Sequence, residues 1–238
     1  MSGVKSPVVA LVQARLSSTR LPGKVISDLA GRPLIVFMIE RLQHAKRLDQ
    51  IVVATSEDAS DDPLVELLVE RGIDHVRGSL HNVLSRYLFA ARSTGARTIV
   101  RLTADCPLID PNLVDDVVGA LDGHDYSSNI EPRTYPDGLD VEAFTIEALI
   151  RADSSADLLA DREHVTPWMR NAASGLRRAC CVSPLKLGAL RWTVDRSEDL
   201  DYVRSLVAQV DHPIEADQFD FLRAMWKIDR AVSLQKVG

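Results

Sequence analysis

The sequence predicts an α/β fold with a mostly parallel sheet, and three observations support this. Short apolar runs alternate with amphipathic patterns of ~10–15 residues in the first half of the chain, as in β–α–β crossovers. Pro, Gly and Asp mark the ends of several helical patterns. No Pro/Gly/Ser-rich linker interrupts the 238 residues, and a chain of this length can form one large domain, so we predict a single domain over residues 1–238.

Four short runs in the first half predict strands. They are 7–14 (PVVALVQA), 50–56 (QIVVATS), 74–78 (DHVRG) and 98–105 (TIVRLTAD). In parallel sheets ligands bind beyond the carboxyl ends of the strands. The polar residues within 15–24, 55–62 and 103–106 are therefore the first candidates for a site.

Helical periodicity fills the intervals between these strands. In residues 33–45 the apolar side chains recur at i, i+3 and i+4 spacings, which place them on one helix face. Gly72 and Gly95 are predicted to end the second and third helices, and Asp110 before Pro111 is predicted to cap the fourth. The predicted helices are 33–45, 61–72, 81–95 and 110–121.

The second half of the chain is less regular. The predicted strands there are 125–132, 138–145, 177–183 and 187–195. Helical patterns occupy 144–155 and 160–173, and two more follow residue 195. We expect this half to elaborate the same domain.

Composition excludes several classes of protein. The net charge is −6, with 28 Lys and Arg against 34 Asp and Glu, which argues against a general nucleic-acid binder. No apolar run reaches the ~18 residues of a membrane span, and the first residues lack the apolar region of a signal peptide. Three cysteines form no disulfide or zinc pattern. We therefore expect a cytoplasmic protein without nucleic-acid or membrane partners.

The stretch "QARLSSTRLPGK", residues 13–24, is the first candidate site and is called the opening loop below. It carries cations and hydroxyl groups directly after the first strand, and Gly23 permits an unusual backbone angle. Backbone N–H groups and cations both bind anionic oxygens, so this loop can hold a polyphosphate. It lacks the Walker pattern. The alternative is a solvated turn with scattered cations.

Two aspartates are candidate metal ligands. Asp105 ends a predicted strand, and Asp195 lies between a predicted strand and a helix that Ser197 is expected to cap. Mg²⁺ prefers one or two carboxylates together with phosphate oxygens. The alternatives are a helix N-cap for Asp105 and a helix-start residue for Asp195, with neighbouring Asp199 only complementing the helix dipole.

Further polar residues lie in the second half. Pro136-Asp137-Gly138 is a turn signature. Asp140 and Glu142 are two residues apart and would share one face of a strand, with solvent-facing carboxylates as the alternative. His164 is a candidate pocket residue, although a single helical histidine is more often packed or on the surface.

These motifs occur together in one known order. The stretches are "QARLSSTRLPGKVI", "ATSEDASDDPL", "RGSLHNVLSRY", "RLTADCPLIDP", "PDGLDVEAF", "REHVTPW" and "WTVDRSEDL". In this order the sequence resembles the cytidylyltransferases of sugar activation, and most of all the branch named for spore-coat polysaccharide biosynthesis protein F. It is also similar to the 3-deoxy-manno-octulosonate and acylneuraminate cytidylyltransferases. The resemblance covers residues 8–202.

The resemblance implies an enzyme that transfers CMP from CTP to a sugar or sugar acid and releases pyrophosphate. It implies a three-layer, Rossmann-like nucleotidyltransferase fold with a mixed sheet, Mg²⁺ as cofactor and a homodimer. The nucleotide-binding half would span about 7–120, and sugar-side and dimerisation elements about 121–238.

Residues and resemblance together give a set of candidate site residues. The predicted catalytic residues are Arg15, Lys24 and Asp105. The predicted metal ligands are Asp105 and Asp195. The predicted nucleotide-binding residues are Gln13, Ala14, Arg15, Ser17, Ser18, Thr19, Arg20, Lys24, Thr55, Ser56 and Thr103. The predicted substrate-binding residues are Asp137, Asp140, Glu142 and His164.

Departures from the family pattern leave alternatives open. Ala104 and Cys106 stand where the octulosonate enzymes have a glycine and an acidic residue, which leaves the acceptor sugar undetermined. A guanylyl- or uridylyltransferase, a non-catalytic nucleotide-binding protein and a phosphate-binding structural protein are the alternatives. Two roles stay open for Arg20, a phosphate contact or a structural ion pair.

Overall fold

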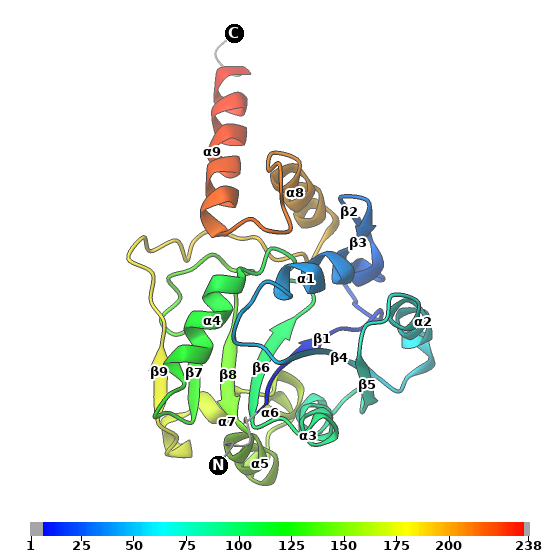
Figure 1. Cartoon of the computed structure of the whole chain (residues 1–238), viewed down its shortest axis with the longest axis vertical. Helices are drawn as coiled ribbons and strands as arrows, with labels where there is room; N and C mark the ends of the chain where they lie inside the picture. Colours follow the sequence, from blue (N-terminus) through cyan, green and yellow to red (C-terminus); the bar gives the residue numbers. More distant parts are fainter. Residues whose placement is uncertain (1–6, 236–238) are drawn as a thin grey trace.

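A mixed, seven-stranded sheet forms the centre of the molecule (Figure 1). The computed structural model describes residues 7–235. The sheet order is β5-β4-β1-β6-β8-β7-β9. The strands are β1 Val8–Gln13, β4 Gln50–Ser56, β5 His75–Gly78, β6 Thr98–Thr103, β7 Tyr126–Ser128, β8 Glu142–Thr145 and β9 Arg178–Cys180. A small second sheet pairs β2 Asp28–Leu29 with β3 Arg32–Pro33.

The parallel part of the sheet comes from the first half of the chain. β5, β4, β1 and β6 are all parallel, whereas β8 is antiparallel to both β6 and β7. β9 returns parallel to β7. Both halves of the chain therefore contribute to one sheet, which confirms the single α/β domain and the mixed sheet.

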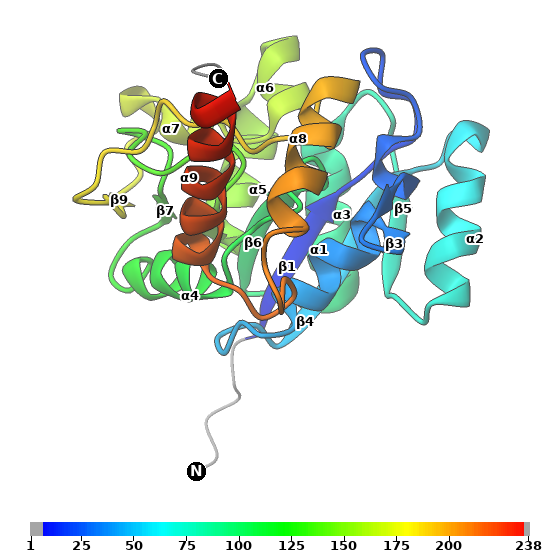
Figure 2. The ribbon, with the colours of Figure 1, turned by 90° about the horizontal axis from the view of Figure 1, so that it is seen from above.

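Helices cover both faces of the sheet (Figure 2). On one face α1, α4 and α8 pack in a core with Ala10 and Val12, and on the other α3 and α5 pack with Val9 and Leu11. Successive strand residues point to opposite faces, so β1 supplies both cores. The helices are α1 Leu34–Leu42, α2 Asp62–Glu70, α3 Val83–Thr94, α4 Pro111–Ala120, α5 Ile146–Ser155, α6 Leu159–His164, α7 Pro167–Arg170, α8 Ser197–Val207 and α9 Gln218–Gln235, with 3₁₀ turns η1 Lys24–Ile26, η2 Ala59–Asp61 and η3 Ala172–Ser174.

Two predicted elements are wrong in detail. The single helix predicted over 160–173 is divided into α6 and α7, because Val165 has a φ of 71° and Pro167 follows it. The predicted strand 187–195 is irregular and makes only an isolated bridge between Arg191 and Asp137 within the described residues.

Of the two predicted N-terminal caps, the structure confirms that of α4 and not that of α8. The Asp110 carboxylate accepts from the backbone N–H of Asn112 at 2.9 Å, which confirms the predicted cap of α4. Ser197 does not cap α8. The cap position is Arg196, whose N–H donates to the Asp199 carboxylate at 3.0 Å.

Among the helices of residues 7–235, none is both long and apolar enough to cross a bilayer.

Candidate functional site

The opening loop leaves β1 and folds back on itself before η1. Gly23 has a φ of 72°, which is a left-handed conformation that glycine adopts without steric cost. Its N–H donates to the carbonyl of Leu16 at 3.0 Å, so the two ends of the loop are joined. Lys24 directly follows this turn and is thereby directed toward the interior, where it is only 8% exposed.

Asp61 fixes the start of the same loop through a hydrogen bond to its backbone. Its carboxylate is fully buried and accepts from the N–H of Leu16 at 2.7 Å. The other carboxylate oxygen accepts from Thr55 Oγ1 at 3.2 Å and from Ser56. Thr55 and Ser56 were predicted to contact the nucleotide, but both are fully buried and do not line the pocket described below. Thr55 and Ser56 donate hydrogen bonds to Asp61, and Asp61 in turn fixes the backbone of the opening loop at Leu16.

Asp105 and Asp195 lie in adjoining segments although they are far apart in sequence. The N–H of Val194 donates to the carbonyl of Asp105 at 2.8 Å, and Thr193 Oγ1 donates to the same oxygen at 3.2 Å. These two bonds fix the irregular segment 187–195 against the end of β6. The convergence of the two aspartates, which the sequence could not show, is thus a property of the backbone.

Lys24 bridges the two carboxylates. Its ammonium nitrogen lies 3.1 Å from Asp195 Oδ1 and 3.4 Å from Asp105 Oδ2. It also donates to the carbonyl of Val194 at 2.7 Å. The opening loop and both aspartates therefore meet at one buried cation.

Asp195 has two further cationic partners. Arg20 donates to Oδ1 at 2.7 Å, and Arg191 donates to Oδ2 at 2.9 Å. Burial alone would raise the pKa of Asp195, but the hydrogen bonds from Arg191 and Lys24 outweigh it and hold this pKa below its ordinary value. The Arg20 contact identifies this residue as an ion-pair partner of Asp195.

Asp199 was predicted only to complement the helix dipole, but it also holds two residues of the site in place. It accepts from the N–H of Asp195 at 2.9 Å and pairs with Arg191 at 3.2 Å. Asp199 and Arg191 were both missed by sequence reasoning. A signal for Asp199 existed, because it stands three residues after the cap position of α8, where an acidic side chain often bonds back to the cap.

A pocket of about 180 Å³ opens where β1 and β6 end. Its lining residues are Gln13, Ala14, Arg15, Ser18, Thr19, Arg20, Lys24, Val25, Thr103, Ala104, Asp105 and Asp195. Most of the predicted nucleotide-binding residues and both predicted metal ligands are thus brought together. Arg15 forms no ion pair with any described residue, so its guanidinium is available to an anionic ligand.

The donor set of this pocket fits Mg²⁺. No group of three or more His, Cys, Asp or Glu side chains that could hold a metal ion occurs in the described part of the chain. Two carboxylates that share one cation do occur, and Mg²⁺ typically takes one or two carboxylates and fills its remaining positions with phosphate oxygens and water.

The predicted substrate-binding residues do not line this pocket. Asp137 and Asp140 both pair with Arg133, at 3.3 and 2.6 Å, and Asp137 also pairs with Arg191 at 3.1 Å. Burial raises the pKa of Asp140 above its ordinary value despite its ion pair. Arg191 pairs with both Asp137 and Asp195, so Asp137 lies at the border of the site.

Glu142 and His164 have other environments than predicted. The Glu142 carboxylate is 3% exposed and bonds Arg101 and Tyr126 within the sheet, each at 2.6 Å. Both oxygens of Glu142 are thus used within the sheet, which indicates a structural role. His164 lies exposed at the end of α6, a helix that packs on α3 and α7, and it does not line the pocket where β1 and β6 end.

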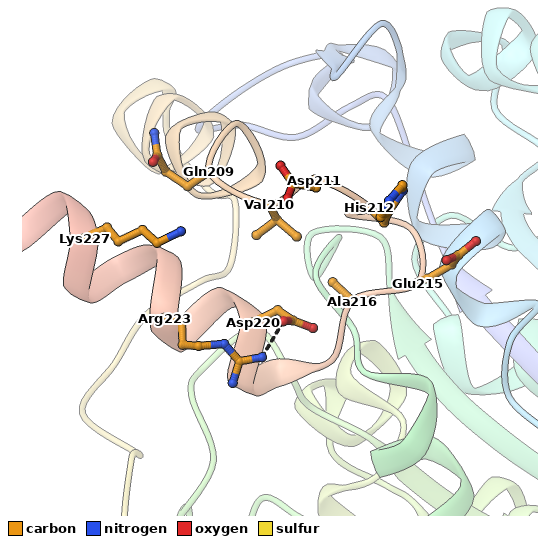
Figure 3. A pocket seen from close by; sticks show the side chains of 9 residues that line it. All are labelled: Gln209, Val210, Asp211, His212, Glu215, Ala216, Asp220, Arg223 and Lys227. Atoms are coloured by element: carbon orange, nitrogen blue, oxygen red, sulfur yellow. Dashed lines mark hydrogen bonds and ion pairs between the residues drawn. The ribbon is translucent and has the colours of Figure 1, made fainter.

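A second hollow lies between α9 and the loop at 209–216 that joins α8 to α9 (Figure 3). It has a volume of about 380 Å³ and carries charges of both signs, including the ion pair of Asp220 with Arg223 at 2.5 Å. None of the predicted site residues lines it. It lies away from the carboxyl ends of β1 and β6, so the smaller pocket is the candidate active site.

A sheet covered by helices on both faces, with cations and paired carboxylates at its strand ends, is suited to binding a nucleoside triphosphate. A family model described as cytidylyltransferase matches residues 9–227. The chain therefore belongs to the cytidylyltransferase family, and it is a nucleotidyltransferase enzyme.

Individual relatives agree with this family. The chain is 32% identical over 209 residues to the spore coat polysaccharide biosynthesis protein SpsF of Bacillus subtilis, covering 84% of this chain and 85% of that protein. It is 37% identical over 119 residues to a 3-deoxy-manno-octulosonate cytidylyltransferase of Anaeromyxobacter dehalogenans, about half of each chain (49% and 48%). The structure of a cytidylyltransferase from Leptospira borgpetersenii superposes with a TM-score of 0.88 at 31% identity and 96% coverage of both chains.

Proposed function

We propose that this enzyme transfers CMP from CTP to a sugar or sugar acid, with release of pyrophosphate. The observation that supports this most is the meeting of Asp105, Asp195 and Lys24 beside the opening loop, in a chain of the cytidylyltransferase family. The similarity to a polysaccharide biosynthesis protein and to an octulosonate cytidylyltransferase supports an acceptor of the sugar class.

The opening loop binds the triphosphate in this proposal. Arg15 and Lys24 neutralise the β- and γ-phosphates, and the hydroxyls of Ser18 and Thr19 donate to phosphate oxygens. All four residues line the pocket. An oxygen of the acceptor attacks the α-phosphorus, a new P–O bond forms, and the bond to the β-phosphate oxygen breaks. Transfers of this kind depend mainly on positioning and charge stabilisation, which cations held in place supply.

Asp105 and Asp195 would hold Mg²⁺. When bound, the ion supplies Lewis-acid polarisation of phosphate oxygens. The chain keeps the two carboxylates oriented for this purpose, because Thr103 Oγ1 donates to Asp105 Oδ1 at 2.5 Å and Arg191 fixes Asp195 Oδ2.

The acceptor lies on the side of Asp137 in this proposal. Asp137 follows the buried turn at Pro136 and borders Asp195 through Arg191. Carboxyl oxygens accept hydrogen bonds from sugar hydroxyls. Asp137 and Asp140 are accordingly proposed to orient acceptor hydroxyls toward the α-phosphate.

Pyrophosphate release tests the proposed reaction. Purified enzyme with Mg²⁺ is assayed with CTP, UTP, GTP and ATP against a panel of sugar acids and sugar phosphates. We expect release with CTP and at least one acceptor. Release with GTP or UTP in place of CTP would contradict the choice of base, and CTP binding without turnover on any acceptor would indicate a non-catalytic nucleotide-binding protein.

A further inference from the structure

We propose that Lys24 competes with a divalent cation for Asp105 and Asp195, so that metal binding frees the Lys24 ammonium for the triphosphate. This inference rests on the proposed function for the identity of the metal and of the nucleotide. It concerns a property of the chain itself, namely which cation neutralises the two carboxylates.

The carboxylate oxygens that face each other are already used by Lys24. The ammonium contacts Asp195 Oδ1 and Asp105 Oδ2, while Thr103 and Arg191 bond the opposite oxygens. The exposed Arg20 also donates to Asp195 Oδ1 but makes no ion pair with Asp105, whereas Lys24 contacts both carboxylates. A metal ion held by the two aspartates would take the place at the carboxylates that the ammonium now occupies. Lys24 contacts both carboxylates, so a doubly charged ion held by them would lie directly against the ammonium. Repulsion between the two cations would therefore drive the ammonium away from the carboxylates.

The contacts of Lys24 allow this movement. Its distances to the two carboxylates, 3.1 and 3.4 Å, are longer than the 2.7 Å to the carbonyl of Val194. The flexible four-carbon stem of lysine permits reorientation of the ammonium. Ser18 and Thr19 line the same pocket, so a triphosphate there would offer Lys24 new oxygen partners.

The exchange has a thermodynamic consequence. If Lys24 and the metal compete, the free energy of one is coupled to that of the other, and the coupling is reciprocal. A divalent cation alone then binds weakly, because it must displace a buried ammonium. A cation that arrives with CTP binds tightly, because the phosphates receive the displaced ammonium.

The test measures metal binding without nucleotide. Mn²⁺ affinity is determined by electron paramagnetic resonance for the wild type, Lys24→Met, Lys24→Gln and the control Lys46→Met, which removes an exposed lysine outside the site. We expect both Lys24 variants to bind Mn²⁺ about tenfold or more tightly than the wild type, within the usual range of such couplings. The control should match the wild type.

A second variant and a second measurement keep the test valid if Lys24→Met does not fold. Lys24→Gln keeps a donor for the Val194 carbonyl and should fold even where Lys24→Met does not, as circular dichroism will show. Mn²⁺ should raise the melting temperature of Lys24→Gln more than that of the wild type. Equal or weaker Mn²⁺ binding by folded Lys24→Gln would overturn the inference. Because no turnover is measured, this result is independent of whether the wild type uses CTP.

Discussion

Asp195 is the residue on which most of the site depends. Lys24, Arg20 and Arg191 all donate to its carboxylate, and Asp199 accepts from its backbone N–H. These partners come from the opening loop, from the irregular segment 187–195 and from α8. Asp195 thus joins three parts of the chain, two through its carboxylate and α8 through its backbone N–H. Its pKa lies below the ordinary value, so the carboxylate is charged at neutral pH.

Removal of Asp105 tests the same site from the other carboxylate. We predict that Asp105→Ala lowers turnover by about 10²-fold or more, the scale of removing one strong transition-state contact. Lys24→Ala is predicted to have an effect of similar size. Pyrophosphate release with CTP is the measurement, and Asp122→Ala, an exposed residue outside the pocket, is the control. Near wild-type release by Asp105→Ala would show that Asp105 is not in the active site.

Asp61 gives a prediction about the opening loop. Asp61→Ala leaves the N–H of Leu16 and the hydroxyl of Thr55 without their acceptor. Each buried group left unsatisfied costs about 1–3 kcal/mol, so the free energy of unfolding should fall by at least that amount. The KM for CTP should also rise, because the loop is no longer held. Asp62→Ala, with a half-exposed carboxylate beside it, should change neither quantity much; equal effects of the two changes would argue against the anchoring role.

At the scale of elements, the turn at Pro136 to Gly138 determines where segment 187–195 lies. The N–H of Trp192 donates to the carbonyl of Asp137 at 2.6 Å, and the N–H of Asp137 donates to Leu190 at 2.9 Å. A Cβ at Gly138 would come within 2.6 Å of the backbone of Trp192 and Thr193. Because these are backbone atoms, a side chain at position 138 would force the backbone of Trp192 and Thr193 to shift.

Gly138→Ala is therefore predicted to displace Asp195. Gly123→Ala is a matched control, because Gly123 also has a positive φ but a Cβ there meets nothing within 4 Å. The control should lose about 1–2 kcal/mol of stability from its left-handed backbone alone. Gly138→Ala should lose more and should also lower turnover. Equal melting temperatures and activities for the two variants would contradict this account of the turn.

The sheet contains an ion pair between Arg101 and Glu142 whose role is structural, and the two side chains are 16% and 3% exposed. Burial alone would lower the pKa of Arg101, but Glu142 raises it above its ordinary value. Glu142→Ala leaves this guanidinium without its partner, and we predict a loss of about 3–5 kcal/mol in the free energy of unfolding. Glu147→Ala breaks an exposed pair at 3.9 Å with Arg97 and should change stability by less than about 0.5 kcal/mol. Denaturant unfolding of both variants measures the difference.

Sequence patterns predicted the elements that have local or repeated signals. The strands predicted at 50–56 and 98–105 were found because they are short apolar runs, and the helices that follow them because amphipathic patterns with Pro, Gly or Asp at their ends mark them. Segment 187–195 was misassigned because its apolar residues resemble a strand, while its backbone partners are the distant residues Asp105 and Asp137. The roles of Thr55 and Glu142 were missed for the same reason, since burial of a polar side chain depends on partners that the local sequence does not specify.

At the scale of the whole molecule, the fold gathers a few cations of an acidic chain at one edge. The chain has a net charge of −6, yet Arg15, Arg20 and Lys24 all line the pocket where β1 and β6 end. The sheet order places these two strands side by side, so the opening loop and Asp105 become neighbours. Local concentration of charge, and not net charge, is what an anionic nucleotide requires here.

The predicted homodimer belongs to the same scale. Light scattering of the purified protein should give a mass near twice that of one chain, 26.2 kDa. A mass of one chain at assay concentrations would contradict the prediction without affecting the active-site assignment.

The fate of the α-phosphate tests the central claim most directly. The enzyme is incubated with Mg²⁺, an acceptor and CTP labelled at either the α- or the γ-phosphate, and the products are separated. Our account predicts α-label in the sugar product, γ-label in pyrophosphate, and neither product with Asp195→Asn. Transfer of γ-label to the acceptor, or full transfer by Asp195→Asn, would contradict it.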